Sequence, residues 1–151
     1  MAEALGEFVG EVDVAVGPPV LVGAGPLGER RIIPIEGGRV SGPRMEGEIL
    51  PGGADFQLIR PDGVAEIEAR YTIRLADGAL VYVVNRGLRT AAPADMARLL
   101  RGEPVPPERV YFRTTPAFET AAPAHAWLGR SLFLGFGERR PESVHIRIFA
   151  V

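Results

Sequence analysis

Residues 52–87 read GGADFQLIRPDGVAEIEARYTIRLADGALVYVVNRG, and this stretch decides the fold class. Two Asp-Gly pairs, Asp62-Gly63 and Asp77-Gly78, separate three runs that are rich in valine, isoleucine and tyrosine. Aspartate and glycine favour tight turns, and an alternation of apolar with polar residues is typical of strands with one buried face. The stretch therefore predicts a meander of three antiparallel strands at residues 55–60, 64–75 and 79–86.

Further short strands are expected on both sides of this meander. The 19 glycines and 14 prolines are spread along the chain, and they interrupt apolar segments at roughly 8–12-residue spacing, which is typical of an all-β sandwich or barrel. We expect a loop at residues 23–28 and a turn at Gly37-Gly38. Strands are predicted at residues 7–16, 20–22, 31–36, 39–41, 45–50, 111–115, 126–136 and 143–151.

A single segment, residues 90–101, has helical character. Met96, Leu99 and Leu100 fall on one side of it, Pro93 lies in its first turn, and Gly102 follows it. We expect this short helix to pack across a barrel mouth or a sheet edge. The fold class predicted is all-β with one short helix: an antiparallel β-barrel, closed or nearly closed, of about 8–10 strands, because closure removes exposed strand edges. The length fits one domain, residues 1–151.

Composition excludes several classes of chemistry. The chain has no cysteine, and all of its 17 basic residues are arginine, so thiolate nucleophiles, disulfides and lysine Schiff bases are excluded. A net charge of −2 argues against a nucleic-acid-binding surface, which needs a basic patch. The first residues resemble no signal peptide, and no apolar run is long enough for a membrane span. We therefore expect a cytoplasmic protein with neither a nucleic-acid nor a membrane partner.

Motifs for metals, nucleophiles and nucleotides are weak. His125 and His145 are the only histidines, and their spacing does not match a metal site, so no metal is expected. None of the three serines lies in a Gly-x-Ser-x-Gly turn. The GAGPLGE sequence at residues 23–29 spaces its glycines like a nucleotide-binding loop, but a proline-containing strand and not a helix is expected after it. No cofactor is expected.

A cluster of charged residues is the best candidate site. Glu66, Glu68 and Arg70 alternate along the middle strand of the meander, and side chains at every second position share a face. Asp55 and Gln57 lie on the preceding strand, and Asn85 and Arg86 lie on the next. If this face lines a barrel, partly buried carboxylates beside arginines suit a general base. If it faces water, these are solvated ion pairs. The residues alone favour the solvated alternative, because the opposite face is apolar: Ala65, Ile67, Ala69, Tyr71, Ile73 and Leu75.

Four stretches resemble the DUF3237 family, also called UPF0311, from about residue 20 to the C-terminus. They are the 52–87 stretch, YFRTTPAFET, AWLGRSLFLGFGERR and the closing VHIRIFAV. The resemblance implies a small antiparallel β-barrel and assigns no activity, because the family is named for its unknown function. It also implies an acid at Glu68, arginine at Arg70, and aspartate and glutamine at Asp55 and Gln57, which favours a cluster in the lumen or mouth. The chain departs from the family pattern at Phe56, usually tryptophan, and at Gly129, often asparagine.

Our leading hypothesis is a cofactor-independent enzyme with isomerase, cyclase or lyase chemistry on an apolar carbonyl-bearing or aromatic molecule. Asp55 or Glu68 is expected to be the base, and Arg70 and Arg113 to bind an anionic group or oxyanion. The other substrate-binding candidates are Gln57 and Asn85 as orienting groups and Tyr71, Tyr82 and Trp127 as pocket wall. Tyr71 and Glu68 fall on opposite faces of one strand, so both reach the lumen only if a bulge intervenes.

Two alternatives stay open. A non-catalytic carrier or sensor of a small apolar or aromatic ligand would use the same late aromatic residues as its pocket wall. A homodimeric structural module would explain the Glu/Arg cluster as cross-strand pairs at a symmetric interface, without any ligand.

Overall fold

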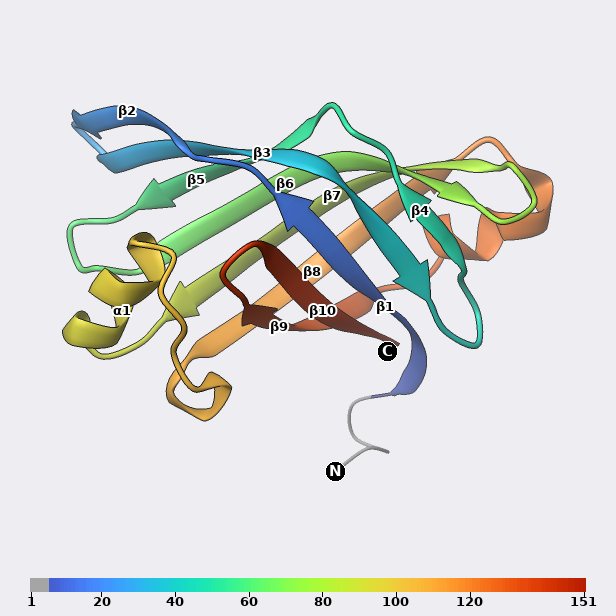
Figure 1. The fold of residues 1–151 in the computed structure, drawn as a ribbon. Coiled ribbons are helices and arrows are strands. Elements are labelled where there is room, and N and C mark those ends of the chain that lie inside the picture. The colour runs from blue at the N-terminus through green and yellow to red at the C-terminus, as the bar shows by residue number, and fades with distance from the viewer. Residues whose placement is uncertain (1–5) are drawn as a thin grey trace.

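The computed structural model describes residues 6–151, and its ten strands form one sheet that closes into an antiparallel barrel (Figure 1). β4 and β5 both lie between β3 and β6, so the closed ring has eight strand positions, and β2 pairs with β3 alone. The predicted all-β barrel is confirmed. Its strands are β1 (Glu7–Val16), β2 (Val20–Gly25), β3 (Gly28–Ser41), β4 (Gly47–Ile49), β5 (Gly53–Ile59), β6 (Ala65–Leu75), β7 (Leu80–Thr90), β8 (Tyr111–Thr120), β9 (Phe133–Arg139) and β10 (Ser143–Ala150).

The first five residues, on which the expectation about a signal peptide partly depends, lie outside the described residues. In the described part of the chain, none of the helices has the length and the apolar character needed to cross a membrane.

The predicted meander is present and consists of β5, β6 and β7. Burial alternates strictly along β6. From Ala65 to Leu75 the odd-numbered residues are buried, and the even-numbered residues are partly or fully exposed. The apolar face therefore lines the barrel interior and the charged face lies outside. Burying six apolar side chains is favourable, whereas burying Glu66, Glu68, Arg70 and Arg74 would require every charge to be paired.

The expected turn at Gly37-Gly38 is wrong. β3 runs unbroken through this pair, and its edges change partner from β5 to β4 on one side and from β2 to β1 on the other. Gly38 has φ of +146°, and a Cβ at this position would lie 2.1 Å from the Asp13 carbonyl oxygen. The two glycines thus let the long strand β3 bend and approach β1 closely. A turn at this position would instead have divided β3 into two strands. Residues 23–28, expected as a loop, belong mostly to the β2–β3 hairpin.

The predicted helix is confirmed as α1 (Pro93–Leu100), with Met96 and Leu99 buried. The prediction of a strand at residues 126–136 is wrong in its first half. This segment forms the 3₁₀ helix η3 (Pro123–Gly129), and the strand begins only at Phe133. A short 3₁₀ turn, η2 (Pro107–Arg109), precedes β8. Leu128 of η3 is 2% exposed, so burial of this side chain in the barrel outweighs the weak strand tendency of the segment.

The helix α1 and the 3₁₀ helix η3 mark opposite ends of the barrel (Figure 1). α1 follows the last residues of β7 and packs Met96 and Leu99 with Ile67 and Phe112. η3 follows the last residues of β8, at the other end, and Leu128 joins the main core there with Phe118 and Phe133. We call the α1 end the mouth and the η3 end the plug.

The single tryptophan reports on the plug. The guanidinium of Arg44 lies 3.8 Å from the ring centroid of Trp127, whose ring is 5.8 Å from that of Phe133. We expect Arg44→Ala to lower the free energy of unfolding by about 0.5–1 kcal/mol, as the cation–π contact is lost together with an exposed ion pair to Glu7, which contributes little. Urea titration followed by Trp127 fluorescence measures this loss, and the exposed Arg39→Ala is the control. Equal stability of the two variants would contradict the role of this contact.

Candidate functional site

A cavity of about 40 Å³ lies inside the barrel toward the mouth. Cross-strand pairing places Asp55 beside Ala69, and Ala69 beside Asn85, so that these residues from β5, β6 and β7 form one row. Most of the wall is apolar, and the polar groups that reach it are few and close together. They are Asp55, Gln57, Tyr71, Asn85, Arg89 and Arg139.

Asp55 is held by two hydrogen bonds. The backbone N–H of Glu68 donates to Oδ1 at 3.0 Å, and Nε2 of Gln57 donates to Oδ2 at 3.1 Å. The β5–β6 pairing runs through Ala54–Asp55 and Leu58–Ile59 and is interrupted in between, where the Asp55 carboxylate takes a backbone N–H. A carboxylate can accept about four hydrogen bonds. Each oxygen of Asp55 therefore keeps capacity to take up a proton.

Burial dominates the acid–base properties of the cavity. It raises the pKa of Asp55, and the hydrogen bonds from Glu68 and Gln57 and the charges of Arg89 and Arg31 oppose this only in part. Burial also raises the pKa of Tyr71 far above its ordinary value. Asp55 is thus a stronger base than an exposed aspartate, and the phenol of Tyr71 stays protonated and can donate.

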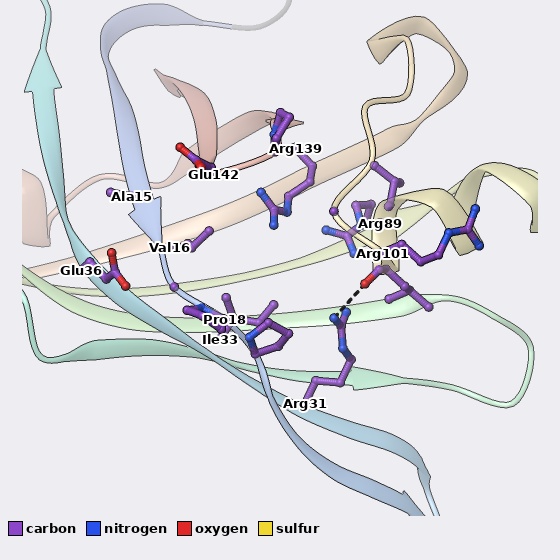
Figure 2. Close-up of a pocket in the computed structure, with 16 residues that line it drawn as sticks. Ala15, Val16, Pro18, Arg31, Ile33, Glu36, Arg89, Arg101, Arg139 and Glu142 are labelled. Carbon is purple, nitrogen blue, oxygen red and sulfur yellow. Dashed lines mark hydrogen bonds between the residues drawn. The ribbon is translucent and has the colours of Figure 1, made fainter.

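A cleft of about 600 Å³ opens at the mouth and leads to this cavity (Figure 2). The two share Val16, Ile33, Arg89 and Arg139 as lining residues. Figure 2 shows Arg31, Arg89 and Arg139 on the side of the cleft toward α1, with Glu36 and Glu142 on the opposite side. The cleft is therefore polarised, with its positive wall next to the carboxylate of Asp55.

The three arginines are fixed to different extents. Arg31 donates from Nη1 to Oε1 of Gln57 at 3.1 Å and from Nη2 to the Leu100 carbonyl at 3.2 Å. Arg139 donates from Nη1 to the carbonyls of Arg140 and Ser143. Arg89 lies 5.8 Å from the Phe112 ring centroid, and its Nε is buried without a hydrogen-bond partner among residues 6–151. Burial lowers the pKa of Arg89 to about 10, with Arg139 and Arg31 adding to the effect.

The structure divides the site residues predicted from sequence into three groups. Asp55, Gln57, Tyr71 and Asn85 meet in the cavity. Trp127 lies in the plug, away from the mouth. The remaining four lie on the outer surface of the barrel: Glu68, Arg70, Tyr82 and Arg113.

The lumenal or mouth position that the family pattern favoured for Glu68 and Arg70 is corrected. Both side chains are more than a third exposed and pair with each other at 3.6 Å, while Arg86 donates to Glu68 at 3.0 Å. The hydrogen bond from Arg86 lowers the pKa of Glu68, which makes it a weaker base than Asp55. β6 contains no bulge, so Tyr71 and Glu68 lie on opposite faces, as strand alternation requires.

Sequence reasoning missed Arg31, Arg89 and Arg139, although the alternation of buried positions along the strands gives a signal for the first two. Arg89 continues the buried phase of Val81, Val83 and Asn85 along β7, and Arg31 shares the phase of Ile33 and Ile35 along β3. A charged residue in the apolar phase of a strand must be paired, or must serve a ligand. This pattern could have indicated Arg31 and Arg89 before the structure.

Within residues 6–151, no three His, Asp or Glu side chains group closely enough to hold a metal ion. The positive and polar donors at the mouth are suited to an organic ligand with oxygen acceptors.

Fold and site together define a closed antiparallel β-barrel with one plugged end and one open, arginine-lined mouth. The model of the family described as "Protein of unknown function (DUF3237)" matches residues 6–151, and the chain belongs to this family. Among curated relatives, a UPF0311 protein of Clostridium acetobutylicum is 41% identical over 146 residues, covering 96% of this chain and 92% of that protein. A UPF0311 protein of Rhodopseudomonas palustris is 43% identical over 145 residues, covering 96% and 95%.

Solved structures share the fold. The crystal structure of a conserved protein of unknown function from Rhodopseudomonas palustris superposes with a TM-score of 0.93 at 43% identity, covering 95% of each chain. A protein with unknown function from Clostridium acetobutylicum gives a TM-score of 0.87 at 41% identity, covering 95% and 94%. An enzyme from Penicillium herquei gives 0.68 at 19% identity, covering 94% and 92%, which is a likeness of fold.

Proposed function

We propose that this protein binds a small carbonyl-bearing or aromatic molecule at the barrel mouth and carries out cofactor-independent acid–base chemistry on it. The observation that carries the proposal is the position of Asp55: a partly buried carboxylate with a raised pKa, anchored at both oxygens, facing an apolar cavity that continues into an open cleft. A raised pKa makes this carboxylate a stronger base for proton transfer than an exposed aspartate.

The proposed step is a proton transfer from carbon. Ionised Asp55 takes the proton from a C–H bond next to a carbonyl, and the electron pair of that bond moves onto the carbonyl oxygen to give an enolate. The protonated phenol of Tyr71 is available to donate a hydrogen bond to the developing negative oxygen. Return of the proton from Asp55 to a different atom completes an isomerisation, and attack or departure of a neighbouring group gives cyclisation or elimination.

The fold neighbour described as an enzyme is consistent with a barrel of this shape holding an active site. A carrier or sensor is the second candidate. The small, mostly apolar cavity would suit a bound ligand even if no proton is transferred. A homodimer and a cytoplasmic location stay predictions. The outer surface has exposed apolar side chains, among them Leu88 and Tyr111, that a second copy could cover.

Hydrogen–deuterium exchange tests the proposal without knowledge of the natural substrate. The purified protein is incubated in D₂O buffer with a panel of ketones, β-keto acids and hydroxylated aromatic compounds, and loss of C–H signal is followed by ¹H NMR. We expect faster exchange next to the carbonyl of at least one compound than in buffer alone. Binding of panel compounds without any exchange would contradict the enzyme and favour the carrier.

The pH dependence of this exchange follows from Asp55. Because the base must be ionised, the rate should rise with pH, with its midpoint above the ordinary carboxyl value of 3.8. The folded protein binds this proton more tightly than the unfolded chain does. Stability linked to Asp55 is therefore fully present below pH 3.8 and is lost as pH rises through the folded-state pKa. An exchange-rate profile measured from pH 3 to 9 checks whether the pKa of Asp55 is raised, and a midpoint below pH 3.8 would contradict this.

A further inference from the structure

Arg31, Arg89 and Arg139, here the mouth arginines, form a positive group without an ion-pair partner at contact distance among the described residues. Among residues 6–151, none of them has a carboxylate oxygen within 4.0 Å of a guanidinium nitrogen. Asp55 is the one carboxylate among the polar groups of the cavity. Glu29 attracts Arg31 from a distance, and Glu36 and Glu142 line the cleft, but none of these carboxylates pairs with a mouth arginine.

The mouth arginines are close enough to disturb one another. Repulsion from Arg139 and Arg31 adds to the effect of burial in lowering the pKa of Arg89, and repulsion from Arg31 does the same for Arg139. Buried arginines normally find a carboxylate or a full set of acceptors. A group that repels itself in the free protein is arranged for a negative partner that arrives from outside.

Hydrogen-bonding capacity is also left over at this position. Nε of Arg89 and Oδ1 of Asn85 are both buried and without a partner in the described part of the chain, and each residue is 2% exposed. All described hydrogen bonds from the Arg139 guanidinium leave from Nη1, so its other nitrogens stay available. Unmet donors and an unmet acceptor line one cavity, which indicates a ligand with both an anionic group and a hydrogen-bond donor.

We propose that the mouth takes an organic carboxylate, with the carboxylate group between Arg89 and Arg139, where the cleft meets the cavity that holds Asp55. This inference rests on the proposed function, since it names the substrate class for the same site. Guanidinium groups match a planar carboxylate with paired N–H donors. The inner cavity of about 40 Å³ has room for only a few atoms, which favours a flat carboxylate over a bulky tetrahedral anion.

The rest of the molecule would lie in the cleft. Its walls near the arginines include Val16, Pro18, Pro19, Ile33 and Leu99, which offer apolar contact to an aliphatic or aromatic body. Glu36 and Glu142 on the opposite side repel a carboxylate there, so only one orientation is favourable. A hydroxyl near the carboxylate would satisfy Oδ1 of Asn85.

Binding of benzoate, compared with the neutral isostere benzamide, tests this inference. Titrations of ¹⁵N-labelled protein followed by ¹H–¹⁵N NMR should show benzoate shifting the amides around Arg89 and Arg139, and benzamide binding about tenfold or more weakly. Arg139→Gln should weaken benzoate about tenfold or more, and the same spectra show whether the variant is folded. Arg39→Gln, an exposed arginine in the same strand as Arg31, is the matched control and should bind as the wild type does.

Equal binding of benzoate and benzamide, or equal weakening by Arg39→Gln and Arg139→Gln, would overturn the inference, as would tighter binding of inorganic phosphate than of benzoate. Asp55→Asn separates it from the proposed function. This variant should bind benzoate at least as tightly as the wild type, because a negative charge is removed. Benzoate binding without proton exchange in the wild type would uphold the carboxylate site and refute the acid–base proposal. Exchange of neutral ketones without benzoate binding would uphold the acid–base proposal and refute the carboxylate site.

Discussion

Asp55→Asn is expected to lower the rate of hydrogen–deuterium exchange by about 10²–10⁴-fold, the range typical of losing a general base. The asparagine Oδ1 can still accept the hydrogen bond from the Glu68 backbone N–H, so the β5–β6 connection is kept. The hydrogen bond from Gln57 is lost, because the asparagine Nδ2 is itself a donor. The side-chain amide cannot take up a proton at neutral pH. We expect the variant to fold and to fail in chemistry, as measured by exchange rates and by thermal unfolding.

Two further variants make this result decisive. Glu119→Gln, an exposed carboxylate-to-amide exchange on β8, should leave the rate unchanged. Glu68→Gln should change it by less than about twofold, because this side chain lies outside the barrel and its pKa is lowered by the hydrogen bond from Arg86. If Glu68→Gln were inactive and Asp55→Asn active, the chemistry would belong to the outer surface, and the site proposed here would be wrong.

Arg89→Met is expected to stabilise the protein and to abolish carboxylate binding. The fall of the Arg89 pKa from 12.5 to about 10 corresponds to about 3 kcal/mol of unfavourable free energy for the charged form at neutral pH. Methionine fills similar space beside Phe112 without a charge or an unmet Nε. Allowing for lost attraction to Asp55, we expect a gain of about 1–3 kcal/mol in the free energy of unfolding. Urea denaturation measures it, and benzoate titration measures the loss of binding.

Arg31→Met is the matched comparison, and its expected effect has the opposite sign. Arg31 donates to Gln57 and to the Leu100 carbonyl, so its removal leaves one buried and one partly buried acceptor without a partner and should destabilise the fold by about 1–3 kcal/mol. Stabilisation by Arg89→Met together with destabilisation by Arg31→Met would show that Arg89 is retained for a ligand and not for folding. Destabilisation by both would mean that Arg89 is structural.

Much of the fold could be predicted because it depends on local patterns. The Asp-Gly turns at residues 62–63 and 77–78 and the alternation between them predict the β5–β7 meander, and the spacing of Met96 and Leu99 predicts α1. The errors came where distant contacts decide. Gly37 and Gly38 resemble a turn until β1 is seen to pack against them, and residues 123–129 become helical because Leu128 closes the barrel end.

The candidate site could be predicted only in part for the same reason. The apolar face of residues 64–75 already favoured an outward position for Glu68, and the structure confirms this, whereas the family pattern alone pointed inward. Asp55, Gln57, Tyr71 and Asn85 were among the predicted residues and do line one cavity. Arg31, Arg89 and Arg139 were not: strand phase could have indicated the first two as buried, but their meeting depends on three strands far apart in the chain.

The amino-acid sequence by itself determined most of the strands, the direction of their apolar faces, the short helix and the absence of thiol and lysine chemistry. These follow from the spacing of residues a few positions apart. The tertiary structure alone decided which end of the barrel is plugged and that three arginines converge near one partly buried aspartate. Closure fixes strand register around the whole ring, and register, not local sequence, sets which side chains meet in the lumen.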